Sequence, residues 1–381
     1  MDRAIKTKNI GLVSGPLSFI LVINFFHPEG LTLEANAILA STVWMAIWWI
    51  TEAIPISVTA LLPIILFPLS GGLELSETTA SFGHKYVFLY LGGFIIAIAM
   101  QKWNLHKRIA LNIISFIGTD VVKIILGFMV ATAFLSMWIS NTATAVMMLP
   151  IAMAIVDQLK DNPNTIENEN KVFGKALMLG IAFSASIGGI STLIGTPPNL
   201  VLAGVVEETF GYEITFSTWF KFGFPISLIL LFLCWKYLTG IAFKFEQKSF
   251  PGGQKEIRNQ LQKLGQITYE EKLVALIFTM TAIAWVTRDF LLKLIVPVID
   301  DTIIVMISAL IIFLLPNKNR NRRLINWEEA SKLPWGILLL FGGGMALASG
   351  FKESGLALFI GTQMTLLDGI NLFLLVFILI T

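Results

Sequence analysis

Two short polar segments interrupt long apolar runs, and both are rich in oxygen atoms that could hold an ion. The first is Ser140-Asn141-Thr142, within the apolar run 121–158. The second is STLIGTPPN at 191–199, within the apolar stretch 173–206. Hydroxyl, amide and free carbonyl oxygens suit an alkali cation, whereas a helix that restarts after a break offers N–H groups and a positive dipole end to an anion.

The backbone around both segments is expected to be broken. At about 1.5 Å per residue the stretch 173–206 is too long for one straight span, and Pro197-Pro198 must interrupt it. Thr142 and Thr196 are candidate N-caps of the helices that follow, and Pro197 then takes the first helical position, where its missing N–H costs nothing. The alternative for the first segment is an ordinary turn between buried helices, because Ser, Asn and Thr favour turns.

The charged residues and the histidines do not indicate a second kind of site, such as a metal centre or an enzyme active site. No Lys or Arg lies close to either polar segment, so a bound anion would depend on dipoles, hydroxyls, amides and a co-bound cation. His27, His84 and His106 fall in predicted loops or in an interfacial helix and do not form a metal set. An intramembrane enzyme would need a His, Asp or Glu cluster at membrane depth, so the sequence predicts no enzyme.

Glu52, in WWITEAIP, is the one carboxylate that invites a functional interpretation. An ionisable residue inside a membrane is a functional candidate by default. However, Glu52 stands at the predicted cytoplasmic end of a span, just before Pro55 restarts the chain. A structural role at the membrane interface is the favoured interpretation.

The composition of this 381-residue chain is that of an all-α polytopic membrane protein. Hydrophobic residues make up 55% and charged residues 14%, against about 25% charged in soluble domains. The net charge of +2, with no basic face, gives no indication of nucleic-acid binding. The single cysteine, Cys234, excludes a disulfide framework. The N-terminal apolar run lacks a clear cleavage site and is interpreted as an uncleaved first span.

The elements that would carry the polar segments follow from the apolar runs. Membrane spans are predicted near 10–26, 38–51, 55–70, 86–101, 173–206, 222–243, 272–291, 300–315 and 334–350. The run 121–158 turns at its polar centre and is predicted to be a re-entrant helical hairpin. The segment 103–117 is predicted to be an interfacial helix.

Lys and Arg set the orientation. They concentrate in the N-terminal segment and in loops 102–108, 159–175, 244–272 and 318–332, which all fall on one side if the N-terminus is cytoplasmic. This assignment requires the hairpin 121–158 to enter and leave on the same side. The prediction is a multi-pass protein of the inner (plasma) membrane with a cytoplasmic N-terminus.

Two pairs of segments indicate an internal repeat. AIWWITE (Ala46 to Glu52) resembles AIAWVTR (Ala282 to Arg288), and the Gly-Gly span that begins at Phe88 resembles the one that begins at Ile337. The charge count gives the two Gly-Gly spans opposite directions, which is the inverted repeat of many secondary transporters. Chance similarity between apolar segments is the alternative.

The motifs WWITEAIPISVTALLP, SNTATAVMMLPIA and IGGISTLIGTPPNLVLAG resemble those of the divalent anion:sodium symporter family. The resemblance covers essentially the whole chain. It implies homodimers in which a transport domain slides against a scaffold in an elevator motion. It also implies a sodium site made by Ser136, Ser140, Asn141 and Gly195, and substrate contacts from Ser140, Asn141, Thr142, Thr196 and Pro197.

Carried onto this sequence, the resemblance gives five parts. They are a first scaffold part at 1–117, a transport domain at 118–243, a cytoplasmic linker at 244–270, a second scaffold part at 271–360 and the start of a second hairpin at 361–381. The expected partners are a small divalent anion, the lipid bilayer and a second copy of the chain.

The expected function is sodium-coupled symport of a divalent anion, most simply a C4 dicarboxylate such as succinate. Three alternatives stay open. They are a sodium-independent dicarboxylate exchanger, a sulfate or citrate carrier of the same fold, and a membrane subunit or receptor that binds the anion without transporting it.

The family's second Ser-Asn-Thr and second Thr/Ser-Pro turn are not found in this sequence. Ser140 follows Gly93 by 47 residues, so its counterpart after Gly343 would fall near position 390, beyond Thr381. The run 365–381 is therefore expected to be the first arm of a second hairpin whose remainder is missing. By itself the chain 1–381 is expected to show no sodium-driven uptake.

Overall fold

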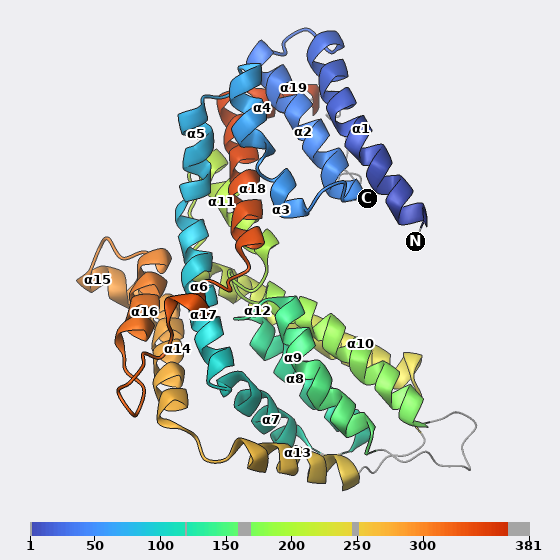
Figure 1. Cartoon of the computed structure of the whole chain (residues 1–381), viewed down its shortest axis with the longest axis vertical. Helices are drawn as coiled ribbons and strands as arrows, with labels where there is room; N and C mark the ends of the chain where they lie inside the picture. The colour runs from blue at the N-terminus through green and yellow to red at the C-terminus, as the bar shows by residue number, and fades with distance from the viewer. Residues whose placement is uncertain (1, 119, 159–168, 246–250, 365–381) are drawn as a thin grey trace. The chain divides into compact units, whose positions relative to one another are not determined.

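The computed structural model describes residues 2–118, 120–158, 169–245 and 251–364, and within these ranges the chain is almost wholly helical (Figure 1). The expected first arm at 365–381 lies outside the described residues. The helices are α1 (Asp2–Phe25), α2 (Leu33–Thr51), α3 (Ile56–Thr59), α4 (Leu62–Ser70), α5 (Leu75–Ala80), η1 (Ser81–Gly83), α6 (Lys85–Lys102), α7 (Leu105–Ile117), α8 (Val121–Ser136), α9 (Asn141–Val156), α10 (Glu169–Ile190), α11 (Pro197–Phe210), α12 (Phe216–Tyr237), η2 (Leu238–Ala242), α13 (Pro251–Leu264), α14 (Tyr269–Thr287), η3 (Arg288–Leu292), α15 (Lys293–Ile295), α16 (Asp301–Leu314), α17 (Trp327–Ala330), α18 (Trp335–Glu353) and α19 (Leu356–Met364).

Long apolar helices confirm the predicted class of an all-α polytopic membrane protein. Among the described residues, 7 helices are long and apolar enough to cross a membrane. They are Ile5–Phe25, Leu33–Thr51, Leu75–Lys102, Asn170–Ile190, Phe216–Ala242, Tyr269–Ile295 and Trp335–Glu353. Shorter apolar helices fill the predicted spans 55–70 and 300–315, and the arms of the predicted hairpin.

The predicted hairpin and the predicted break both form. The run 121–158 folds into α8 and α9, which are joined by the turn 137–140 and pack side by side with α10 (Figure 1). The stretch 173–206 is interrupted between Ile190, the last residue of α10, and Pro197, the first residue of α11. The interruption lies before the prolines because Pro fits the first turn of a helix and not its interior.

Two pairs of helices repeat one local backbone pattern. The long helix α6 is followed by Asn104 in a left-handed conformation, with φ 57°, and then by α7. The long helix α18 is followed by Gly355 with φ 79° and then by α19. Left-handed residues also follow α2 (Glu52) and α4 (Gly71), so the pattern is not specific to these two pairs, and the inverted repeat stays a prediction.

The contacts divide the chain into two compact units. The first unit comprises 1–87, 204–212 and the described part of 334–381. In it α2 packs against α1 and α4, and α18 packs against α3, α4 and η1. Its core is formed by Ala35, Ile38, Phe67, Leu73, Ala346 and Leu356. The ion pair Lys85 Nζ–Glu207 Oε1, at 2.6 Å, lies within this unit.

The second unit comprises the described residues of 88–203 and 213–333 and contains both polar segments. Helix α8 packs against α7, α9, α10 and α12 around a core that includes Phe128, Met129 and Phe173. The segment 244–270, predicted as a linker, contains α13, which packs on α7 and α9. The predicted scaffold and transport domains are defined by which part moves during transport. Their boundaries stay a prediction.

Close approach of α8 and α10 depends on Gly188. A Cβ atom at this position would lie 2.5 Å from Ala133 Cα and 2.7 Å from Ala133 C. These are backbone atoms, so a side chain could be accommodated only if the two helices separated.

We therefore expect Gly188→Ala to destabilise the protein by about 1–3 kcal/mol, as overpacking does. Thermal unfolding in mild detergent measures the change. Gly174→Ala, on the same helix, is the matched control because its Cβ would lie an ordinary 3.4 Å from Val156 Cγ1. Equal melting temperatures for the two variants would contradict this account of the packing.

Candidate functional site

The tip of the α8–α9 hairpin brings three oxygen-bearing groups together. Ser136, the last residue of α8, is buried, and its Oγ lies 2.7 Å from Asn141 Oδ1 and 2.7 Å from Ala185 O of α10. A hydroxyl, an amide and a backbone carbonyl thus converge at one point. Ser136 and Asn141, both predicted sodium ligands, are therefore in direct contact.

Ser140, and not Thr142, is the N-cap of α9, so the predicted N-cap was wrong. Ser140 has φ −55° and ψ 144°, and its Oγ accepts a hydrogen bond from Ala143 N at 3.4 Å. The cap is the last residue before the helical dihedral angles begin, and Asn141 is already helical. Thr142 lies in the first turn of α9 with its side chain exposed.

Glycines let the break approach the tip. A Cβ atom at Gly189 would lie 2.6 Å from Asn141 Oδ1, and one at Gly195 would collide with the backbone of Gly189. The predicted ligands Asn141 and Gly195 are thus brought together through Gly189, which the sequence interpretation did not single out. The tip and the break form one site within the second unit.

Two side chains at the break, Thr192 and Asn199, were not singled out from the sequence and bond to backbone carbonyls of the tip and of the break. Thr192 Oγ1 donates to Met137 O of the tip at 2.5 Å. Asn199 Nδ2 donates to Gly189 O at 2.9 Å and to Thr192 O at 2.8 Å. Asn199 follows Pro197-Pro198 directly, and a polar residue in an otherwise apolar first helical turn was the signal that could have identified it.

The two helix starts differ in what they can offer an anion. Helix α9 begins at Asn141 with ordinary amides, and the first N–H groups of a helix have no partner within it. Helix α11 begins with Pro197 and Pro198, which have no N–H to donate. Thr196 stands directly before α11 as predicted, half-buried, with Pro197 at the first helical position.

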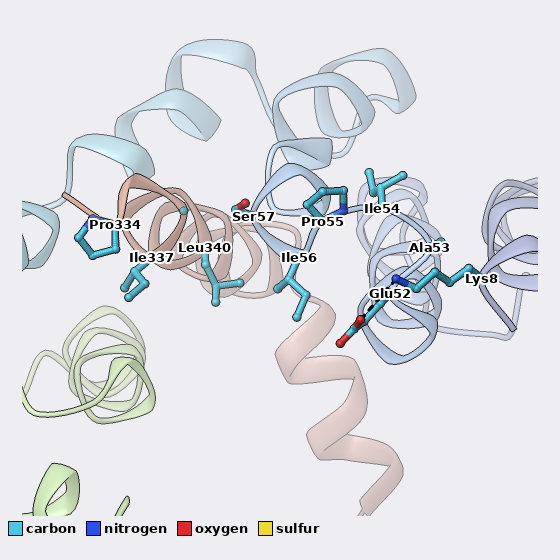
Figure 2. A pocket seen from close by; sticks show the side chains of 11 residues that line it. Lys8, Glu52, Ala53, Ile54, Pro55, Ile56, Ser57, Pro334, Ile337 and Leu340 are labelled. Atoms are coloured by element: carbon cyan, nitrogen blue, oxygen red, sulfur yellow. Dashed lines mark ion pairs between the residues drawn. The ribbon is translucent and has the colours of Figure 1, made fainter. Parts of the chain in front are cut away.

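Glu52 belongs to the first unit, whereas the tip and the break belong to the second. It ends α2 in a left-handed conformation, with φ 46°, and its exposed carboxylate lies 3.6 Å from Lys8 Nζ. Figure 2 shows this pair together with the other side chains that line the pocket. The cavity has a volume of about 540 Å³ and is also lined by the segment 53–57 and the start of α18. The lining is otherwise mainly apolar, and the structural role favoured for Glu52 stays a prediction.

The histidines do not build a metal centre. Among the described residues, no group of three or more His, Cys, Asp or Glu side chains could hold a metal ion. His106 is buried in α7, and burial lowers its pKa below the usual range although its Nδ1 lies 3.1 Å from Met100 O. His27 Nδ1 lies 3.2 Å from Asn36 Nδ2.

A buried ion cluster was not anticipated from the sequence. Arg288, 3% exposed, lies 2.8 Å from Glu213 Oε1, 3.5 Å from Asp300 Oδ2 and 3.1 Å from Asp301 Oδ2. Asp301 Oδ2 also accepts a hydrogen bond from Phe216 N at 2.8 Å. These bonds join the start of α12, the end of α14 and the start of α16.

Comparison with known proteins identifies the family of the chain. A family profile described as "Sodium:sulfate symporter transmembrane region" matches residues 6–381. The chain belongs to this family. It is the divalent anion:sodium symporter family predicted from the motifs, and its members are transporters and not enzymes.

Similar proteins include the sodium-dependent dicarboxylate transporters SdcS of Staphylococcus aureus. The chain is 49% identical over 374 residues to the protein of strain USA300, which covers 96% of this chain and 72% of the relative. It is 48% identical, with the same coverage, to the protein of strain NCTC 8325.

The break should depend on the side chain of Asn199. We expect Asn199→Leu to leave the carbonyls of Gly189 and Thr192 without donors, at a cost of about 1–3 kcal/mol for each buried group that stays unsatisfied. Thermal unfolding measures the loss. The control is Asn170→Leu, because Asn170 Nδ2 donates to Val156 O at the far end of α9. A loss no larger than in the control would mean that Asn199 does not support the break.

Proposed function

We propose that this protein carries a C4 dicarboxylate, such as succinate, across the membrane together with sodium. The observation that carries the proposal is the convergence of the hairpin tip and the helix break, where Ser136, Asn141 and Ala185 O meet beside Gly189. The relatives named for sodium-dependent dicarboxylate transport, at 48–49% identity, support the choice of ion and substrate.

Sodium, as cargo, would bind to Ser136, Ser140, Asn141 and the carbonyl of Gly195. These are neutral oxygen donors, which suit a monovalent hard cation held at a helix break. The buried position of Ser136 and the close approach of Gly189 and Gly195 give the cluster little room for solvent.

One carboxylate of the substrate would bind at the start of α9 through Ser140, Asn141 and Thr142, with Thr196 and Pro197 completing the cradle. The exposed Thr142 side chain and the N–H groups of Asn141 and Thr142 at the start of α9 suit an anion. Pro197 and Pro198 remove two donors from α11, so α9 is the stronger anion site and Thr196 contributes chiefly a hydroxyl.

The proposed oligomeric state, membrane orientation and motion rest on the family resemblance and on the distribution of Lys and Arg. The proposal includes a homodimer in the inner (plasma) membrane, cytoplasmic N-termini, a re-entrant α8–α9 hairpin and an elevator motion of the transport domain. A sodium-independent exchanger, or a sulfate or citrate carrier of the same fold, is the alternative.

Sodium coupling predicts gradient-dependent uptake. With the full-length protein in proteoliposomes, we expect an inward sodium gradient to raise uptake of labelled succinate several-fold over an equal potassium gradient. Equal uptake in the two gradients would contradict coupling and favour the exchanger. Gradient-dependent uptake of labelled sulfate or citrate, with no uptake of labelled succinate, would reassign the substrate.

Because one side chain is proposed to serve both ligands, Asn141→Ala should weaken sodium and succinate binding together. Calorimetry on the chain 1–381 should show sodium affinity reduced roughly ten- to hundredfold, the range for losing a hydrogen bond or ligand to a charged group. Asn170→Ala should leave sodium affinity unchanged. Normal sodium affinity with lost anion binding in Asn141→Ala would refute the shared ligand.

A further inference from the structure

The turn 137–140 lies between the proposed sodium ligands Ser136 and Asn141. Its backbone hydrogen bonds involve mainly Met137, Trp138 and Ile139. Met137 N donates to Ala133 O, and Trp138 N and Ile139 N both donate to Leu135 O, at 2.9–3.1 Å. These bonds close the end of α8. Besides the bonds Ser136–Asn141 and Thr192–Met137, the placement of the tip depends on what the turn packs against.

Trp138 is the largest side chain of this turn, and it packs into a cluster of aromatic rings. Its ring lies edge-on to Phe278 of α14, with the centroids 4.9 Å apart. It stacks with Phe216 of α12 at 5.9 Å and with Trp285 of α14 at 6.4 Å. Trp138 Nε1 is buried with no hydrogen-bond partner among the described residues, so ring packing, and not a polar bond, holds the side chain.

The rings that receive Trp138 are fixed in turn by the buried ion cluster. Trp285 Nε1 donates to Asp301 O at 2.9 Å, and Phe216 N donates to Asp301 Oδ2 at 2.8 Å. Arg288 Nη1 lies 3.1 Å from the same Asp301 oxygen. Phe216 and Trp285 are both fully buried. Trp138 thus rests on a platform whose position is set by charge pairing.

Trp138 also faces the helix break. A void of about 10 Å³ is lined by Trp138, by Ile194 of the break, by Phe278 and Trp285 of α14, and by residues of α6. A void of this size is at the limit for a single water molecule. The ring therefore has little freedom to move toward or away from the break.

We propose that Trp138 is a positioning residue for the sodium site. By resting on the Phe216–Phe278–Trp285 platform and sharing the small void with Ile194, its ring sets the distance between the hairpin tip and the break, and hence the size of the oxygen cage. This role rests on the proposed sodium site. Sites of this kind require their ligands to be held within about 0.5 Å, which a side chain packed on rigid neighbours can provide.

The alternative is that Trp138 only fills space, in which case its loss would lower stability without altering ion binding in particular. Trp235 is a suitable control for that alternative. It is a half-buried tryptophan of α12 in the same unit, with its Nε1 bonded to Val122 O at 3.2 Å and its ring packed on Phe232, away from the tip.

The test compares wild type, Trp138→Ala, Trp138→Phe and Trp235→Ala in the chain 1–381. Hydrogen exchange of peptides that cover 136–143, measured without sodium, reports whether the tip is held. Calorimetry with sodium and with lithium reports affinity and selectivity. We expect Trp138→Ala to speed exchange at the tip, to weaken sodium binding about tenfold and to lower the sodium-to-lithium preference. Trp138→Phe should restore most of each property, because packing matters and the indole N–H has no partner.

Two results would overturn the proposal. One is a Trp138→Ala protein whose tip exchange and sodium affinity equal those of wild type. The other is an equal loss of sodium affinity in Trp235→Ala, which would mean general destabilisation. Absence of sodium binding in wild type would instead refute the proposed function, and the exchange comparison would still decide whether Trp138 holds the tip.

Discussion

The structure depends on satisfying the backbone groups that are freed where α10 stops and α11 begins. In an apolar surrounding each unpaired carbonyl is costly, so a break persists only where side chains or a ligand replace the lost helical bonds. Asn199 does this for Gly189 and Thr192, and Thr192 in turn bonds to Met137 O of the hairpin. The same bonds that make the break tolerable thus attach it to the tip, and the candidate site follows from that attachment.

Local signals were sufficient to predict the class, the hairpin and the break. Prolines and turn-forming residues determine the backbone conformation of their immediate neighbours in the sequence. Pro197-Pro198 and Ser140-Asn141-Thr142 could therefore be interpreted without knowledge of the fold. The choice of Thr142 as N-cap failed because capping depends on where helical dihedral angles begin, and either serine or threonine could have started α9. Which residues bind sodium and which bind the substrate stays a prediction.

Features that join distant segments could not be predicted. The Arg288–Asp301 contact spans neighbouring helices, but Glu213 and Phe216 come from another part of the chain, and no periodicity links them. The partners of Trp138 are similarly remote, on α12 and α14. Gly189 was missed because a glycine in an apolar helix gives no sign of which backbone or amide approaches it. Such contacts are tertiary, and a single sequence records the residues without their pairing.

A dicarboxylate site without Lys or Arg has a physical consequence for coupling. The proposed anion contacts are dipoles and hydroxyls at the start of α9, while Pro197 and Pro198 weaken the start of α11 as a donor. Such contacts alone compensate only part of a divalent charge, so a sodium ion beside Asn141 would supply the missing attraction at short range. Because linkage is reciprocal, an anion that binds better with sodium present must also strengthen sodium binding by the same factor. Coupling would then follow from the lack of a fixed positive charge, since a permanent arginine would bind the anion whether or not sodium was present.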